Sequence, residues 1–195
     1  MNRKIILASQ SQARKKIFSL LNIPFAVVPA HIDEQAIRHD DPGMQAELIA
    51  RAKAEAVAKE HPNAIIIAAD TFTVCDGIIL EKPHDTKEAA QMLRLQSGKP
   101  GMAYSGFCYI DAVNKIQYST TVETAFTFRE LQEEEIAVYV RKFPVTTWSA
   151  AYSPATAYTL TMIASMNGSA TSFTHGLPME VLISLLQKSG FSAHP

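Results

Sequence analysis

The apolar run from Ala64 to Ala69, closed by Asp70, constrains the fold more than any other stretch of this chain. Such a run is typical of an interior strand that presents the Asp at its C-terminal end. Ligands of open α/β sheets bind at those ends, and a carboxylate there can act as a general base or hold a divalent cation. An isolated Asp is more often a turn cap, so the functional hypothesis depends on the residues that join it.

Composition narrows the class of protein. With 195 residues, 47% of them hydrophobic, the chain can bury a sizeable core, and its length predicts one domain with two lobes. A formal net charge of −1 indicates neither nucleic-acid nor membrane-surface binding. Cys75 and Cys108 lie in apolar runs, as reduced core thiols of a cytosolic protein do. Because only four apolar residues precede Ser9, we expect no signal peptide or membrane span and predict a cytoplasmic protein.

The first elements suggest a phosphate site. A strand over 4–8 leads into a Ser-rich turn at Ser9 and then a helix, whose apolar stripe we place at Ile17, Leu20 and Leu21. Free backbone N–H groups at such a helix start can hold a phosphate. An ordinary Ser N-cap followed by solvated basic residues explains the local sequence equally well, and the Walker pattern is missing.

Three further segments carry residues that are candidates for the site. After a second strand over 25–29, the loop around Asp33 and Glu34 is either a solvated turn or a pair of ligands for a hard cation. Lys53 flanks the apolar stripe of a helix over 43–60, where a lysine usually extends to solvent. Asp76-Gly77 between two apolar runs predicts a type I′ hairpin, whose nearly equal arms bring Lys82 back near Asp70.

The second half alternates strands and helices. We expect a helix over 85–95, two long strands at 102–112 and 116–128, and a helix over 131–142. The last helix begins at Gly176-Leu177-Pro178, with Pro at its first position, and stops at Gly190. Residues 148–165 have no clear hydrophobic period.

Taken in order, these segments resemble the Maf family, nucleoside triphosphate pyrophosphatases once known through septum-formation inhibition. Each motif is weak by itself, whereas the ordered set is specific. The matching segments are Leu7-Ala8-Ser9-Gln10-Ser11 (family LASxS), Ile32-Asp33-Glu34 (IDE), Lys53 in the next helix, Ala68-Ala69-Asp70-Thr71, Lys82-Pro83, Leu95-Gln96-Ser97-Gly98-Lys99 (LSGK) and Gly176-Leu177-Pro178.

The resemblance implies a fold similar to inosine triphosphate pyrophosphatases: one α/β domain over 1–195, an elongated mixed sheet flanked by helices, and two lobes around a cleft. It implies a homodimer that hydrolyses the α–β phosphate bond of a nucleoside triphosphate with Mg²⁺ or Mn²⁺, and Asp70 as the proton acceptor. It assigns catalysis to Asp70 and Lys82, phosphate binding to Ser9, Arg14, Lys53 and Lys82, and metal binding to Glu34 and Asp70.

The chain departs from the family where the base is selected. The family's opening continues SPRR or SPWR, and this chain has SQAR, so Ala13 stands at a substrate-selecting position. In residues 150–155, Ala155 replaces a polar residue of the family, or, if the alignment shifts by one, Thr156 stands at that position. Thr71 matches the branch that acts on thymidine and uridine triphosphates. We therefore predict an intact phosphate and metal half with an altered or relaxed base pocket. The alternative is a nucleotide-binding regulator of cell division with reduced or lost catalysis; a protein-interaction module is third.

Overall fold

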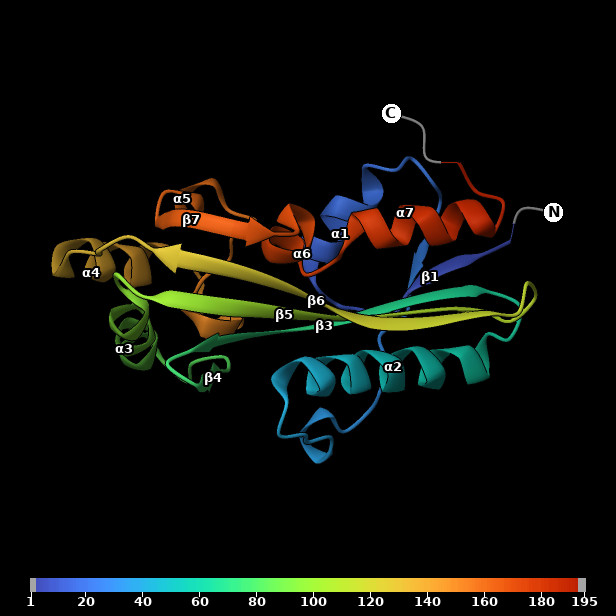
Figure 1. The fold of residues 1–195 in the computed structure, drawn as a ribbon, viewed down its shortest axis with the longest axis horizontal. Helices are drawn as coiled ribbons and strands as arrows, with labels where there is room; N and C mark the ends of the chain where they lie inside the picture. Colours follow the sequence, from blue (N-terminus) through green and yellow to red (C-terminus); the bar gives the residue numbers. More distant parts are fainter. Residues whose placement is uncertain (1–2, 193–195) are drawn as a thin grey trace. The chain divides into compact units, whose positions relative to one another are not determined.

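The computed structural model describes residues 3–192, whose helices and strands are drawn in Figure 1. The described chain divides into two compact units. Unit 1 comprises residues 3–71, 105–122 and 169–192, and unit 2 comprises residues 72–104 and 123–168. Three long strands contribute residues to both units. The prediction of one domain over 1–195 stays a prediction.

Within the described residues, seven strands form one open sheet in the order β2-β1-β3-β5-β6-β7, and β4 pairs with β3 beside this path. Helices flank the sheet, and the predicted mixed α/β class is confirmed. The strands are β1 (Ile5–Leu7), β2 (Ala26–Val27), β3 (Ile65–Cys75), β4 (Ile78–Leu80), β5 (Pro100–Asp111), β6 (Ile116–Phe128) and β7 (Ile163–Gly168).

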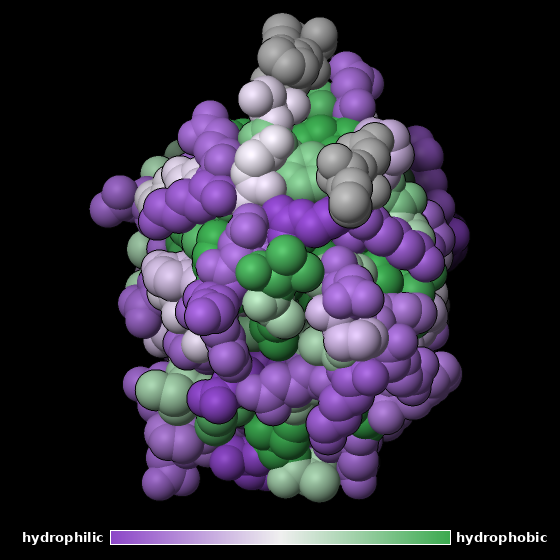
Figure 2. All heavy atoms as spheres, turned by 90° about the vertical axis from the view of Figure 1, so that its right-hand side faces the viewer, coloured by the Kyte–Doolittle hydropathy of each residue, from purple (hydrophilic) through white to green (hydrophobic). Residues whose placement is uncertain are grey.

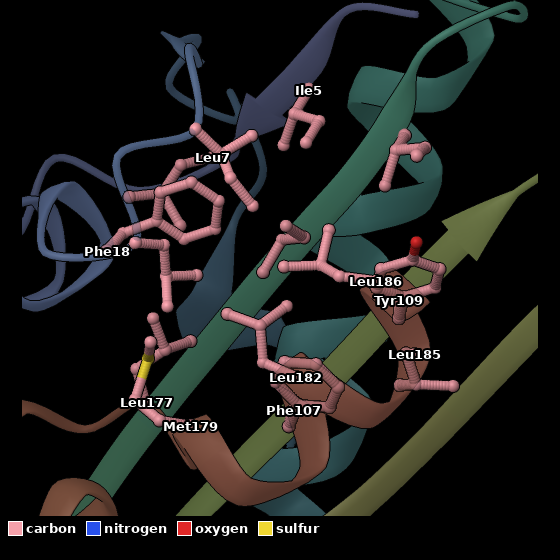
Figure 3. Packing of buried hydrophobic residues seen from close by; sticks show 14 of the residues in the cluster. Ile5, Leu7, Phe18, Phe107, Tyr109, Leu177, Met179, Leu182, Leu185 and Leu186 are labelled. Carbon is pink, nitrogen blue, oxygen red and sulfur yellow. The ribbon is translucent and has the colours of Figure 1, made fainter. Parts of the chain in front are cut away.

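The first part of β3 is an interior strand, as predicted, and it is covered on both faces. In unit 1 β1 runs parallel to both β2 and β3. Ile65, Ile67 and Ala69 belong to a core cluster with residues of α1 (Gln12–Ser19) and α7 (Met179–Lys188), shown in Figure 3. Ile66 and Ala68 pack with α2 (Pro42–Glu60) on the other face. Burial of both faces explains why this segment is continuously apolar.

The predicted end of this strand was wrong. Asp70 does not end β3, because the strand continues through Cys75. The neighbouring strand β1 is the one that ends near Asp70: it stops at Leu7, which pairs with Ile67. Asp70 therefore lies three residues beyond the last pair of the parallel β1–β3 ladder, where the chain after β1 no longer pairs with β3.

The apolar stripe of α1 was partly wrong. Leu20 is 65% exposed, whereas Phe18 and Leu21 are buried. Arg14 lies on the same buried face, one turn before Phe18. The Ser11 side chain caps this helix by accepting a hydrogen bond from the Arg14 N–H, as the N-cap interpretation expects.

Helix α2 approaches the sheet closely at Gly106 of β5. A Cβ atom at Gly106 would lie 2.1 Å from the backbone carbonyl of Ala46. Overpacking typically lowers the free energy of unfolding by roughly 1–3 kcal/mol. We expect Gly106→Ala to cost at least this much, because the backbone of α2 cannot move aside as a flexible side chain could. Urea unfolding measures this; an unchanged midpoint would show that α2 does not pack as described.

A buried carboxylate anchors the end of β5 in unit 1. Asp111 accepts hydrogen bonds from the Ser189 hydroxyl at 2.6 Å, from Asn114 and from Arg3. Burial raises the pKa of Asp111, but the hydrogen bonds from Ser189, Arg3 and Asn114 outweigh it and hold the pKa below its ordinary value. A depressed folded-state pKa stabilises the protein above the unfolded-state pKa, and this stability is lost as pH falls through the folded value.

Asp111→Asn is therefore expected to be less stable than wild type at pH 7. The difference should shrink as the pH falls below about 4, the ordinary pKa of Asp. Urea unfolding at pH 7, 5 and 3.5 measures the difference, with Asp40→Asn at an exposed position as the control. A difference that stays constant with pH would contradict the depressed pKa.

Unit 2 begins with the predicted hairpin. Asp76 and Gly77 both have positive φ, 51° and 74°, as a type I′ turn requires, and Thr73 pairs with Leu80 in the ladder. Helix α3 (Thr86–Gln96) starts at the Asp85 cap, and α4 (Glu133–Lys142) follows β6. Both helices were predicted.

Residues 148–165 form short pieces. They include the single turn Ser149–Ala151, helix α5 (Ala157–Leu160) and the start of β7, which pairs antiparallel with β6. Strand β7 is the last in the sheet order, and its residues are mostly exposed. A strand without a buried face shows no alternation of apolar residues, which is why the sequence did not reveal it.

The end of unit 1 was predicted in part. Gly190 ends α7 with φ 83°, as expected, but Pro178 is the N-cap of α7 and not its first helical residue. The preceding helix α6 (Ala170–His175) is short and polar and was not predicted. No helix within residues 3–192 is long and apolar enough to cross a membrane. The face shown in Figure 2 has hydrophilic side chains around smaller hydrophobic groups.

Candidate active site

Lys53 joins two carboxylates in unit 1. Its ammonium donates to Oδ1 of Asp70 at 2.7 Å and to Oε2 of Glu34 at 2.8 Å. The side chains of Lys53 and Asp70 are only 11% and 12% exposed, whereas that of Glu34 is 49% exposed. The usual extension of lysine to solvent is therefore not observed here. One ammonium between two carboxylates leaves one net negative charge.

The local sequence explains how these three residues meet. Lys53 lies on the buried face of α2, between Ala50 and Ala54. Asp70 follows Ile66 and Ala68 on the face of β3 that α2 covers, because side chains alternate along a strand. Glu34 begins a single helical turn, Glu34–Ala36, where a loop was predicted. The Asp33 carboxylate caps this turn by accepting from the backbone N–H groups of Gln35 and Ala36.

Arg14 forms a second cluster on the opposite face of β3. Its Nη1 donates to Ser9 Oγ at 3.2 Å, its Nη2 to Thr71 Oγ1 at 2.9 Å, and its Nε to the Gly176 carbonyl at 3.0 Å. Thr71 follows Asp70 on β3, so the two side chains point to opposite faces of the sheet. The sequence placed Ser9, Arg14 and Thr71 in one site, and the structure brings them together.

The charge of Arg14 is poorly compensated. All three partners are neutral, and no ion pair involves Arg14 within the described residues. Burial lowers the pKa of Arg14, while the charges of Asp70 and Glu34 raise it in part. Because three of the five N–H groups of an arginine are used here, two remain for an anion. A buried cation with neutral partners is a costly arrangement unless an anionic ligand completes it.

Sequence reasoning missed two residues of this cluster. Gly176 has φ 64°, and a Cβ there would lie 2.5 Å from Thr71 Oγ1, so glycine is required beside Arg14. The motif that contains it was recognised as a helix start and as a family match, but no part in the site was assigned to it. The Ser105 hydroxyl lies 3.4 Å from Thr71 Oγ1, and a single Ser within an apolar strand carried no signal.

The remaining predicted residues lie elsewhere. Ala13 is half-buried on α1, next to Arg14. Lys82 and Ala155 belong to unit 2: Lys82 is exposed two residues after β4, and Ala155 is in the turn before α5. The predicted closeness of Lys82 to Asp70 stays a prediction.

Unit 2 also has a hollow of about 400 Å³, lined largely by apolar side chains such as Val74, Met102 and Met166. None of the predicted site residues lines it. We therefore place the candidate site at the two clusters of unit 1, where the charged groups are.

The chain is similar to known proteins over nearly its whole length. The family model for Maf-like protein matches residues 4–189. The chain is 34% identical over 190 residues to a dTTP/UTP pyrophosphatase of Deinococcus radiodurans, which covers 97% of this chain and 95% of the relative. It is 39% identical over 137 residues to a dTTP/UTP pyrophosphatase of Moorella thermoacetica, covering 70% of this chain and 71% of the relative. Because the family model matches nearly the whole chain, the chain belongs to the Maf-like protein family.

Proposed function

We propose that this protein is a nucleoside triphosphate pyrophosphatase, which cleaves between the α- and β-phosphates to release a nucleoside monophosphate and pyrophosphate. The observation that carries the proposal is the buried Arg14, which has no ion pair within the described residues and donates to Thr71, the neighbour on β3 of the Lys53-bound Asp70. The relatives described as dTTP/UTP pyrophosphatases support it. Phosphoryl transfer depends on positioning and on neutralising spread negative charge, and these clusters offer both.

The residues divide into two roles. Asp70 accepts the proton of the attacking water, and Lys53 fixes the Asp70 carboxylate through Oδ1. Within the described residues, Oδ2 of Asp70 accepts no hydrogen bond from the protein, so it is the oxygen we assign to the water. Ser9 and Arg14 bind phosphate oxygens, and Lys82 of unit 2 adds positive charge for the phosphates, as the resemblance implies.

A divalent cation, Mg²⁺ or Mn²⁺, is part of the proposal. Within residues 3–192, no three His, Cys, Asp or Glu side chains lie so that together they could hold a metal ion, so protein ligands alone would not saturate a cation. Asp70 and Glu34 still fit the role, because Mg²⁺ is commonly held by one or two carboxylates, waters and substrate phosphates. When bound, the cation would supply positive charge to the triphosphate.

Substrate choice is proposed to depend on Ala13, Thr71 and Ala155. Replacing a polar contact to a base edge by alanine removes on the order of 1–3 kcal/mol of discrimination. The Thr71 hydroxyl accepts from Arg14, so we infer that Thr71 acts on specificity through the position of Arg14. We also propose that the protein is cytoplasmic and forms a homodimer. Light scattering measures the oligomeric state.

The test is pyrophosphate release from a panel of nucleoside triphosphates that includes dTTP, UTP and modified nucleotides. We expect release with Mg²⁺ or Mn²⁺, loss of release with EDTA, and monophosphate as the second product. Diphosphate and inorganic phosphate would identify a different bond. Nucleotide binding without release would favour the regulator of cell division, which the alanines at 13 and 155 also support. Absence of nucleotide binding would reject both the enzyme and the regulator.

A further inference from the structure

Two consecutive alanines in unit 2 have left-handed backbone. Ala150 has φ 57° and ψ 18°, and Ala151 has φ 64°. Both are fully buried. This region is unfavourable for residues with a Cβ, and such strain persists only where the surroundings hold it and is concentrated at functional sites. The contacts that hold this turn are therefore informative.

One of these contacts comes from Gln96, the last residue of α3. Its Nε2 donates to the Ala150 carbonyl at 3.0 Å and to the Met92 carbonyl at 3.0 Å. The opposite orientation of the amide would place an oxygen against these two acceptors, so the assigned orientation is the favourable one. Gln96 is 1% exposed, and its Oε1 has no partner within the described residues.

An unpartnered buried oxygen is unfavourable. An apolar residue of similar size would avoid it, so the two hydrogen bonds of Nε2 are the apparent benefit of a glutamine at this position.

The turn contacts the loop that carries Lys82. The Ala150 N–H donates to the Glu81 carbonyl at 3.0 Å. Because the ladder of β3 and β4 ends at Leu80, this contact holds the backbone immediately before Lys82 after regular pairing has stopped.

The same turn leads into the segment that carries Ala155. Tyr152, the next residue, is buried, its hydroxyl lies 3.3 Å from Thr73 Oγ1, and its ring meets that of Phe128 edge-on. Ala155 follows three residues later. The strained turn thus contacts the segment of Lys82 directly and is joined to Ala155 through the chain, both within unit 2.

We propose that Gln96 is a positioning residue for the two site-bearing segments of unit 2, acting through the left-handed Ala150 turn on the backbone before Lys82 and on the segment of Ala155. The inference rests on the proposed functions of Lys82 and Ala155. Gln96 itself does not touch substrate in this proposal. It holds a strained turn whose relaxation would move both segments.

The first experiment measures backbone hydrogen exchange and needs no turnover. In Gln96→Leu, peptides covering 78–84 and 148–156 are expected to exchange about tenfold faster, because a local opening has become easier. Gln91→Leu, on the exposed side of the same helix, should leave both peptides unchanged. Unchanged exchange in Gln96→Leu would overturn the proposal.

The second experiment is a double-mutant cycle in pyrophosphate release. Gln96→Leu should lower kcat/KM by roughly 10- to 100-fold, the loss that small misplacements cause. In the Lys82→Ala background the same change should have a clearly smaller effect, because the part that acts through Lys82 is already lost and only the part that acts through the segment of Ala155 remains. An equal loss in both backgrounds would show a general structural role and overturn the proposal.

The two experiments separate this inference from the proposed function. If the wild type releases no pyrophosphate, the proposed function fails, and hydrogen exchange still decides whether Gln96 holds the two segments. If Gln96→Leu does not fold, the same comparison is made between Ala150→Gly and Gln96→Leu/Ala150→Gly, because glycine removes the penalty of the left-handed backbone.

Discussion

Asp70→Asn is expected to lower kcat for pyrophosphate release by about 10²–10⁴-fold, the contribution typical of a general base. The amide has almost the shape of the carboxylate but does not accept a proton at neutral pH. It also lacks the charge that pairs with Lys53 at 2.7 Å. Release is measured with the best substrate of the nucleotide panel, and circular dichroism confirms that the variant is folded.

The matched control is Asp76→Asn. Asp76 lies on the same hairpin in a turn with positive φ, which asparagine adopts readily, and its ion pair with Lys99 is exposed. Activity should be unchanged in this control. A fully active Asp70→Asn enzyme would remove Asp70 from the mechanism and with it the assignment of the site.

Lys53→Met is expected to have the second-largest effect. It leaves the Asp70 and Glu34 carboxylates without the ammonium that both accept from, so Asp70 is no longer held for the water. We expect kcat/KM to fall by about 100-fold or more, because misplacing a reacting group has an effect of that order. A fully buried ion pair that loses one partner lowers the free energy of unfolding by about 3–5 kcal/mol. The decrease should be smaller here, because Glu34 is half-exposed.

Arg51→Met is the control on the same helix. Arg51 forms an exposed pair with Glu55 one turn away, and such pairs contribute about 0.3–0.5 kcal/mol. Its activity should equal that of wild type. If Lys53→Met retained normal kcat/KM, the bridge between the two carboxylates would have no part in catalysis.

Local chemistry made several features predictable. The Asp76-Gly77 hairpin follows from the positive φ that these two residues tolerate, and its turn type was predicted correctly. The first part of β3 follows from a run of apolar residues, which only burial on both faces explains. Helix caps such as Ser11 and Asp85 depend on neighbours within one turn, so they too are set by local sequence.

Other features depend on partners distant in sequence. A strand without a buried face, such as β7, has no hydrophobic period to read. Asp70 lies just past the end of the parallel β1–β3 pairing, because β1 stops at Leu7 while β3 continues. The sequence of either strand alone does not contain that relation.

The amino-acid sequence by itself determined the mixed α/β class, the order of most elements and, through the ordered motifs, the family. These depend on hydrophobic period, turn residues and motif order, all of which are local. Tertiary structure alone decided that Lys53 is buried between Asp70 and Glu34, and that Arg14 lies against Ser9, Thr71 and Gly176 with no ion pair within the described residues. A charged side chain that is solvated and one that is buried can have the same local sequence. Only packing against a particular face of β3 distinguishes the two cases.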